Sequence, residues 1–233
     1  QFMKYVEFEL IGDYALFSDI ITRPGGEKNT YMVPTYEALK GAAKNCFWKP
    51  TINWVIDAVR VMNPIRTEPI NKLLSNYSTS GKDLACFTYL RDVRYQVRAH
   101  FEWNMRDQEF EKDRNAGKFG AIIQRAVRAG GRYDIFLGTR ECQAELRPCV
   151  FGEGEGYYDH MGEMELGYMY HGLTYPDAAD VLPGEEDFLT VRFWRPVMKN
   201  GIITFIRPEE CADRRHIRKF EPTTWKDKRK RIR

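Results

Sequence analysis

The segment Phe87–Trp103 constrains the fold more than any other part of the chain, because apolar and polar residues alternate along it. Every second residue of its later part is apolar, namely Val93, Tyr95, Val97, Ala99, Phe101 and Trp103. The residues between them are polar or charged, namely Arg94, Gln96, Arg98, His100 and Glu102. A period of two places these sets on opposite faces of a β-strand. We therefore predict a long strand that buries one face in a sheet.

The other elements of residues 1–147 follow from hydrophobic periodicity and from Pro or Gly at their ends. In chain order we expect a strand at 5–11, a helix at 34–46, a strand at 52–62, the strand at 87–103, a helix at 118–129 and a strand near 134–145. Residues 63–85 are polar and rich in turn residues, which indicates a long connection. This βαββαβ order is the split-βαβ, ferredoxin-like pattern of an α+β protein.

The composition changes after Pro148, and we predict a second domain at 148–213. Residues 164–175 are a candidate strand. The apolar runs 189–197 and 202–206 flank Asn200-Gly201, and Asn-Gly between two such runs is a strong hairpin signal. We therefore expect a small antiparallel β-sheet appended to the first domain.

Charge is distributed unevenly along the chain. Residues 214–233 hold ten Lys or Arg against two acidic residues, a net charge of +8. Because the whole chain has a net charge of +3, residues 1–213 carry −5. Net charge therefore gives no support for nucleic-acid binding by the body. We predict a basic tail at 214–233, which can contact phosphates or remain solvated.

Several classes of protein lack support in this sequence. There is no run of eighteen apolar residues and no visible signal peptide, so we expect no membrane span and a cytoplasmic location. The five cysteines form no CxxC pair, and the four histidines form no HExxH motif. We therefore expect neither a disulfide framework nor a metal site, and no cofactor.

The stretch 118–146 concentrates basic residues around a helix, a Gly130-Gly131 stop and a strand. Four arginines are our candidates for contacts with a phosphate backbone, namely Arg125, Arg128, Arg132 and Arg140. Solvated arginines on an ordinary loop would give the same pattern. Lys118 stands at the helix entry, where the helix field favours an anion, so it can hold a phosphate. A solvated first-turn lysine is the alternative.

Several longer motifs, in order, resemble one known family. They are GDYALF (12–17), VPTYEALKG (33–41), FWKP (47–50), YQVRAHFEWN (95–104), GRYDIFLGTREC (131–142) and VMKNGIITF (197–205). Together they resemble the CRISPR-associated Cas-five family, in its d subtype from type I-C systems. The resemblance runs from about residue 4 to about residue 211 and excludes the basic tail.

The resemblance implies both a fold and a function. It implies a ferredoxin-like N-terminal domain with a C-terminal antiparallel sheet. It also implies an RNA-binding endoribonuclease that cuts the CRISPR precursor transcript at its repeat hairpins and stays with the guide RNA in the type I-C surveillance complex. In this family cleavage needs no metal, because the ribose 2′-OH attacks the adjacent phosphate and leaves a 2′,3′-cyclic phosphate. That reaction needs a base, an acid and a cation for the phosphorane charge.

The family pattern supplies a Tyr, a Lys and a His for this chemistry. The lysine position falls on Lys118, the tyrosine position on Phe47 and the histidine position on Phe119. Phenylalanine cannot transfer a proton. Phe119 also completes an apolar helical stripe, so packing is an alternative role for it. Tyr36 is a possible substitute for proton transfer, as are Tyr31 and His216.

Three functions are therefore open. The first is an active repeat-specific endoribonuclease that uses Lys118 and an unidentified proton-transfer partner. The second is an RNA-binding structural subunit of the complex with weakened or lost cleavage. The third is a metal-dependent general nuclease acting on duplex DNA, for which we find no carboxylate set. A test of metal dependence distinguishes the third from the others.

Overall fold

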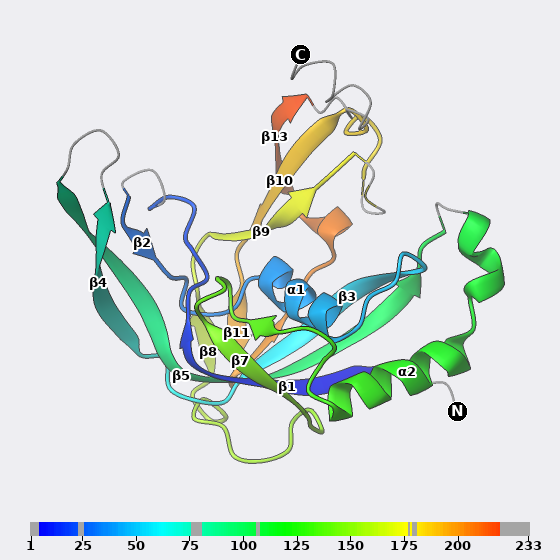
Figure 1. The fold of residues 1–233 in the computed structure, drawn as a ribbon, viewed down its shortest axis with the longest axis horizontal. Helices are drawn as coiled ribbons and strands as arrows, with labels where there is room; N and C mark the ends of the chain where they lie inside the picture. Colours follow the sequence, from blue (N-terminus) through cyan, green and yellow to red (C-terminus); the bar gives the residue numbers. More distant parts are fainter. Residues whose placement is uncertain are drawn as a thin grey trace.

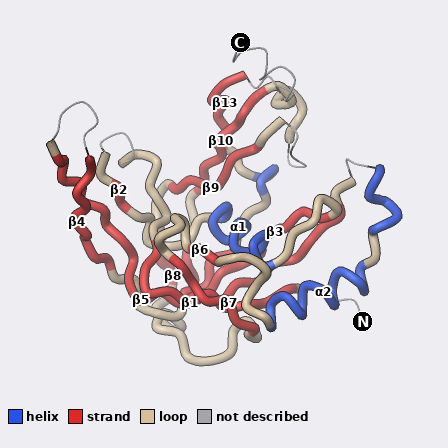
Figure 2. The backbone as a smooth tube through the Cα atoms, in the orientation of Figure 1, coloured by secondary structure: helices blue, strands red, loops and turns tan. Residues whose placement is uncertain are grey.

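The computed structural model describes residues 5–22, 26–75, 81–105, 108–176, 178 and 181–219. The chain is mostly β with few helices. One large antiparallel sheet forms the body of the molecule, and a separate three-stranded antiparallel sheet stands above it in the view of Figures 1 and 2. Among the strands that the structure describes, only the two-residue strand β2 runs parallel to its neighbour, β5.

The strands are β1 (Val6–Ala15), β2 (Lys28–Asn29), β3 (Ile52–Val61), β4 (Thr67–Ser75), β5 (Lys82–Trp103), β6 (Ile135–Phe136), β7 (Gln143–Pro148), β8 (Glu163–Glu165), β9 (Met169–Thr174), β10 (Phe188–Trp194), β11 (Val197–Lys199), β12 (Ile202–Thr204) and β13 (Asp213–Lys219). The helices are α1 (Tyr36–Cys46) and α2 (Ala116–Arg128), with the short 3-10 helices η2 (Gln108–Asp113) and η3 (Pro208–Glu210).

The first five predicted elements are present in order as β1, α1, β3, β5 and α2, with β2 and β4 as additional strands. The strand predicted near 134–145 is divided by a turn into β6 and β7. The central strands lie in the order β7-β1-β5-β3 and pair antiparallel. The chain crosses from β1 to β3 through α1 and from β5 to β7 through α2. Apolar residues of both helices belong to one core cluster with β1, β3 and β5.

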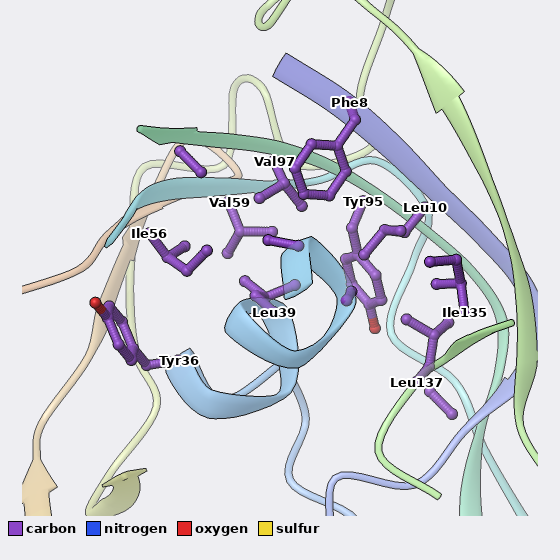
Figure 3. Close-up of a cluster of buried hydrophobic side chains, with 14 of the residues drawn as sticks. Phe8, Leu10, Tyr36, Leu39, Ile56, Val59, Tyr95, Val97, Ile135 and Leu137 are labelled. Atoms are coloured by element: carbon purple, nitrogen blue, oxygen red, sulfur yellow. The ribbon is translucent and has the colours of Figure 1, made fainter. Parts of the chain in front are cut away.

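The alternation in β5 has the predicted effect. Val97 and Ala99 are fully buried, whereas Arg94 between the apolar positions is exposed. Figure 3 shows Val97 and Val59 facing Leu39 of α1 within this core. Gln96 departs from the pattern, since it is buried on the polar face. The segment after β7 covers that part of the face.

A long two-stranded arm is the main feature that the sequence reading missed. Residues 63–85, which we predicted to be a connection, include β4 and the start of β5. These strands pair from Thr67↔Leu90 to Ser75↔Lys82 and project from the body of the sheet (Figure 1). Most of β4 is exposed. Without a buried face, its residues show no apolar alternation.

The strands after Pro148 do not all belong to one small sheet, because they are divided between the two sheets. Strands β12, β11 and β8 continue the large sheet beyond β3. The predicted hairpin is confirmed, because β11 pairs with β12 around Asn200 and Gly201, both with positive φ. The predicted strand at 164–175 is interrupted between β8 and β9, where Gly167 has φ +75. Strands β9, β10 and β13 make the separate small sheet.

The first residues of the predicted basic tail belong to a strand, because residues 213–219 form β13. This strand pairs with β10 through backbone hydrogen bonds, which do not require an apolar sequence. Residues 220–233 of the predicted tail lie outside the described residues. Among the described helices, none combines the length and apolarity needed to cross a membrane.

A buried arginine joins the small sheet to α1. Arg192 of β10 is fully buried, and its Nη2 donates to Oε1 of Glu37 in α1 at 3.0 Å. Its Nη1 donates to the hydroxyl of Thr174 in β9. His171 lies beside it and its Nε2 is 3.0 Å from the carbonyl oxygen of Ile206. A buried guanidinium needs such partners to offset its desolvation.

Candidate functional site

The C-terminal end of α1 meets the N-terminal end of α2 at Phe47 and Phe119. Phe47 is the C-cap residue of α1, and Phe119 lies in the first turns of α2. Their ring centroids are 5.9 Å apart in an edge-to-face arrangement, and both side chains are fully buried. Trp54 of β3 donates its indole N–H to the carbonyl oxygen of Phe47 at 2.7 Å. The two positions to which the resemblance assigns the family's Tyr and His are therefore in contact.

Phe119 is enclosed by further aromatic rings from β5. The ring centroid of Trp103 lies 5.2 Å from that of Phe119, and the centroid of Phe101 lies at 6.2 Å. Aromatic pairs at such distances stabilise a core beyond the area that they bury. The side chain at position 119 is thus a packing element between α2 and the sheet.

Two lysines share one carboxylate beside these rings. Lys118 Nζ lies 2.6 Å from Oδ1 of Asp113, and Lys49 Nζ lies 3.2 Å from Oδ2 of the same residue. The hydroxyl of Thr51 donates to Oδ2 at 3.2 Å. We call Lys49 and Lys118 the lysine pair. Their side chains are 40% and 49% exposed, so both ammonium groups are accessible to a ligand.

Local structure explains how the lysine pair forms. Asn115 caps α2 by accepting the backbone N–H of Lys118 at 2.9 Å, which places Lys118 in the first turn. Asp113 ends η2 just before this cap. Lys49 follows α1, and its Nζ lies 5.6 Å from the ring centroid of Phe119. Hydrogen bonds from Lys118 and then Lys49 hold the pKa of the Asp113 carboxyl below its usual value.

Arg132 covers the other side of Phe47. Its guanidinium carbon lies 4.5 Å from the Phe47 ring centroid. The backbone N–H of Arg132 donates to the carbonyl oxygens of Asn45 and Cys46 near the end of α1. Gly130 and Gly131 allow the chain to turn from the end of α2 toward the end of α1, because both take positive φ values that other residues rarely adopt. Of the four candidate arginines, Arg132 is thus placed beside the cluster of Phe47 and Phe119.

The other three candidate arginines are also exposed. Arg125 and Arg128 belong to the last turns of α2. A rise of about 1.5 Å per residue puts Arg128 roughly 15 Å from Lys118 along the helix axis. Arg140 lies in the turn before β7, with its guanidinium 5.6 Å from the ring centroid of Phe136.

The three proposed substitutes for proton transfer lie in other parts of the fold than the lysine pair. Tyr36 begins α1, roughly 16 Å from the end of that helix, and its buried ring stacks on His171 with centroids 4.4 Å apart. Figure 3 shows it at one end of the core cluster. The hydroxyl of Tyr31 accepts the backbone N–H of Tyr170 at 3.3 Å. His216 lies in β13 of the small sheet.

Sequence reasoning missed two residues of this site, Lys49 and Asp113. Lys49 stands in the FWKP motif but gave no signal of its own. Asp113 lies between the elements predicted at 87–103 and 118–129, and no spacing rule connects it with Lys49, 64 positions earlier. Among the residues that the structure describes, no group of three or more His, Cys, Asp or Glu is placed to hold a metal ion.

Comparison of the chain with known proteins identifies its family. The Cas5d model of CRISPR-associated proteins matches residues 5–206. A CRISPR pre-crRNA endoribonuclease Cas5d from Mannheimia succiniciproducens is 28% identical over 228 residues, covering 85% of this chain and 93% of the relative.

Two solved structures are also similar. One is a crystal structure of a CRISPR-associated protein, with 32% identity, a TM-score of 0.74 and coverage of 91% of this chain and 96% of the other. The second is a functionally uncharacterised protein from Streptococcus mutans, with 33% identity, a TM-score of 0.72 and coverage of 91% and 97%. The resemblance predicted from the motifs is confirmed. The chain belongs to the Cas5d family of CRISPR-associated proteins.

Proposed function

We propose that this chain binds the repeat hairpin of precursor CRISPR RNA, cleaves it without a metal ion and remains bound as a subunit of the type I-C surveillance complex. One observation carries the proposal. The ammonium groups of two half-exposed lysines converge on Asp113, just before α2. One of them is Lys118, which the resemblance assigns to the family's lysine position. The name of the Mannheimia relative, a pre-crRNA endoribonuclease, supports the same substrate.

The proposed reaction is a transesterification within the RNA. The ribose 2′-oxygen attacks the adjacent phosphorus, and the bond from phosphorus to the 5′-oxygen breaks. The products are a 2′,3′-cyclic phosphate and a 5′-hydroxyl group, so a proton leaves the 2′-OH and another reaches the departing oxygen. Lys118 and Lys49 face the negative charge that develops on the phosphorane. An ammonium group of the lysine pair can also protonate the leaving oxygen.

The weak point of this site is the base for the 2′-OH. Phe47 and Phe119 cannot accept a proton, and Asp113 is a weak base because its pKa is lowered by the lysine pair. General acid–base help is worth about 100- to 10,000-fold in rate. We therefore expect slow cleavage compared with relatives that keep the Tyr and His.

The scaffold of this site fits the same proposal. We assign the β7-β1-β5-β3 core with α1 and α2 to a ferredoxin-like domain at residues 1–147. Residues 148–213 form the second unit, which adds β8, β11 and β12 to the large sheet and β9 and β10 to the small one. We keep residues 214–233 as a basic extension, which now begins within β13.

The exposed arginines provide the proposed RNA contacts. We assign Arg125, Arg128, Arg132 and Arg140 to the RNA backbone, with Arg132 closest to the cluster of Phe47 and Phe119. Guanidinium groups suit phosphate because they offer paired N–H donors. Their different positions on α2 and the following turn would contact successive phosphates and orient the RNA.

A second function is favoured by the burial of Phe47 and Phe119. If packing has replaced proton transfer at both positions, the chain is an RNA-holding subunit and another protein cuts the transcript. Both functions predict RNA binding, and they differ only in cleavage.

Substitution of the lysine pair separates the two functions. With the repeat RNA of the chain's own CRISPR array, we expect Lys118→Ala to slow cleavage by about 100- to 1,000-fold. We expect a smaller loss for Lys49→Ala. Lys199→Ala is the matched control, because Lys199 is an exposed lysine of β11 that pairs with Glu163. Equal rates for native protein and both lysine-pair variants would contradict the proposed role. RNA binding with no cut by native protein would favour the holding subunit.

A further inference from the structure

Three hydrogen-bond donors converge on the carboxylate of Asp113, the last residue of η2. Lys118 Nζ lies 2.6 Å from Oδ1, while Lys49 Nζ and the hydroxyl of Thr51 each lie 3.2 Å from Oδ2. In Figure 1, η2 is the short green helix at the right of the view, above the start of α2. The donors come from two segments that are far apart in the sequence. The fold therefore gathers them around a single small anion.

The three donors are held in place by bonds that do not involve the Asp113 carboxylate. The backbone N–H of Asn104, at the end of β5, donates to the carbonyl oxygen of Thr51 at 2.9 Å, and Thr51 is only 1% exposed. On the other side, the side chain of Asn115 accepts the backbone N–H of Lys118 at 2.9 Å. The backbone around each donor is thus fixed by the core and by the cap of α2.

The element that carries Asp113 is attached less firmly. No residue of η2 is buried, and the Asp113 side chain is 29% exposed. Both lysines that face it are about half-exposed. Ion pairs between such exposed groups contribute little to stability. Another anion can therefore take the place of the Asp113 carboxylate at small cost to the fold.

A phosphodiester has the chemistry of that carboxylate. Each carries one negative charge shared between two oxygens, and both accept hydrogen bonds from ammonium and hydroxyl groups. The donors that hold Asp113 can therefore hold the two non-bridging oxygens of an RNA phosphate. The two anions cannot both use these donors, because like charges brought so close repel each other.

We propose that Lys49, Thr51 and Lys118 form the binding site of the scissile phosphate, and that Asp113 is a positioning residue that occupies this site until the RNA displaces it. The inference rests on the proposed function for the identity of the RNA. It adds the buried Thr51 hydroxyl as a third phosphate ligand. It also gives Asp113 a role, since its carboxylate keeps two like charges together in the free protein and competes with the substrate.

Removal of the competing charge tests the role of Asp113. Binding is measured with repeat RNA that carries a 2′-deoxyribose at the cut site, so that no RNA is cleaved. We expect Asp113→Asn, which keeps the shape of the side chain, to bind this RNA about 3- to 10-fold more tightly than native protein. Glu111→Gln is the matched control, because Glu111 is an exposed acid of the same η2. It removes the same charge and should leave the affinity unchanged.

A second set of variants tests the phosphate ligands. In the native protein, Thr51→Val removes one contact with Asp113 before binding and one with phosphate after it, so the affinity should change by less than about 2-fold. In the Asp113→Asn protein the neutral amide competes weakly, and Thr51→Val should weaken binding about 3- to 10-fold. Lys49→Ala should show the same dependence on residue 113, and its half-exposed side chain makes a folding defect an unsuitable explanation.

The outcomes separate this inference from the proposed function. If native protein binds the RNA but Asp113→Asn binds no more tightly, or Glu111→Gln tightens binding equally, the competition by Asp113 is overturned and RNA binding stands. If neither Thr51→Val nor Lys49→Ala weakens binding by the Asp113→Asn protein, the phosphate site is overturned. If native protein does not bind the RNA, the proposed function fails and this inference fails with it. A purely structural role for Asp113 predicts no gain in affinity.

Discussion

Replacing Phe119 by histidine introduces the residue that the resemblance leads us to expect at a position that this chain uses for packing. The Phe119 ring is fully buried and contacts the rings of Phe47, Phe101 and Trp103. The nearest charge on that side is Lys49, whose Nζ lies 5.6 Å from the ring centroid. An imidazole placed here would lose apolar contacts and bury a polar N–H.

The size of the effect follows from these contacts. Burying a polar group without a partner costs about 1–3 kcal/mol in proteins, and lost aromatic pairing adds roughly 1 kcal/mol. We therefore expect Phe119→His to lower the free energy of unfolding by about 2–4 kcal/mol at pH 7.5. Burial and the Lys49 ammonium both disfavour the imidazolium, so the pKa of the new histidine should lie below its usual value of about 6.5.

This pKa shift predicts a pH dependence. A depressed pKa means that the unfolded chain binds the proton more tightly than the folded chain as the pH falls below about 6.5. The loss of stability should therefore be about 1 kcal/mol larger at pH 5.5 than at pH 7.5. The native histidines are common to both proteins, so their contribution cancels in the difference.

Urea unfolding at both pH values measures the effect, and Phe119→Leu is the matched control. Leucine keeps the site apolar, so its stability loss should be smaller and independent of pH. A Phe119→His protein as stable as the native chain, or one stabilised at pH 5.5, would refute the view that position 119 is enclosed. An increase in cleavage rate would show that the imidazole still reaches the RNA.

Three further outcomes are expected. Glu37→Ala should reduce the free energy of unfolding by on the order of 3 kcal/mol in urea titrations, because it leaves the buried Arg192 guanidinium without its carboxylate. Glu37→Gln should reduce it by less. Equal stability of the native protein and both variants would contradict this expectation. The hydrogen bond that His100 donates to the Asp57 carboxylate raises the pKa of His100. This pair therefore stabilises the fold below about pH 6.5, and the contribution is lost as the pH rises through the folded-state pKa. Asp57→Asn should therefore shift the melting temperature more at pH 6 than at pH 9, and an equal shift would argue against the pair. Arg132→Ala should weaken RNA binding and reduce the slope of log K against log salt by about 0.7–0.9, whereas an unchanged slope would remove Arg132 from the phosphate contacts.

The elements that the sequence predicted are those with one buried face. The strict alternation of β5 and the apolar stripe of α2 identify which residues enter the core, and the core contains Val97, Ala99 and Phe119. Turn chemistry was equally informative at Asn200-Gly201, where both residues need positive φ.

The elements that were missed gain their order from backbone pairing rather than from a buried face. Strand β4 pairs with β5 along an arm whose residues are mostly exposed. Strand β13 is basic and pairs with β10. A hydrophobic pattern cannot reveal such strands, because backbone hydrogen bonds form with almost any side chain.

The candidate site, too, could be predicted only in part from the sequence. The resemblance could place Lys118, Phe47 and Phe119 at related positions, and the structure brings them together with Lys49 and Asp113. The pairing of Lys49 with Asp113 depends on how α1 and η2 meet in space. No local pattern encodes that contact, so only the fold could identify the second lysine.

The most direct test of the central claim is a cleavage assay of the native protein in EDTA with two repeat RNAs that differ in one atom. One carries an ordinary ribose at the cut site, and the other carries a 2′-deoxyribose. We predict a single slow cut in the first RNA, with a 2′,3′-cyclic phosphate end, and no cut in the second despite equal binding. Cleavage of the 2′-deoxy RNA, or activity that requires an added metal ion, would contradict the account.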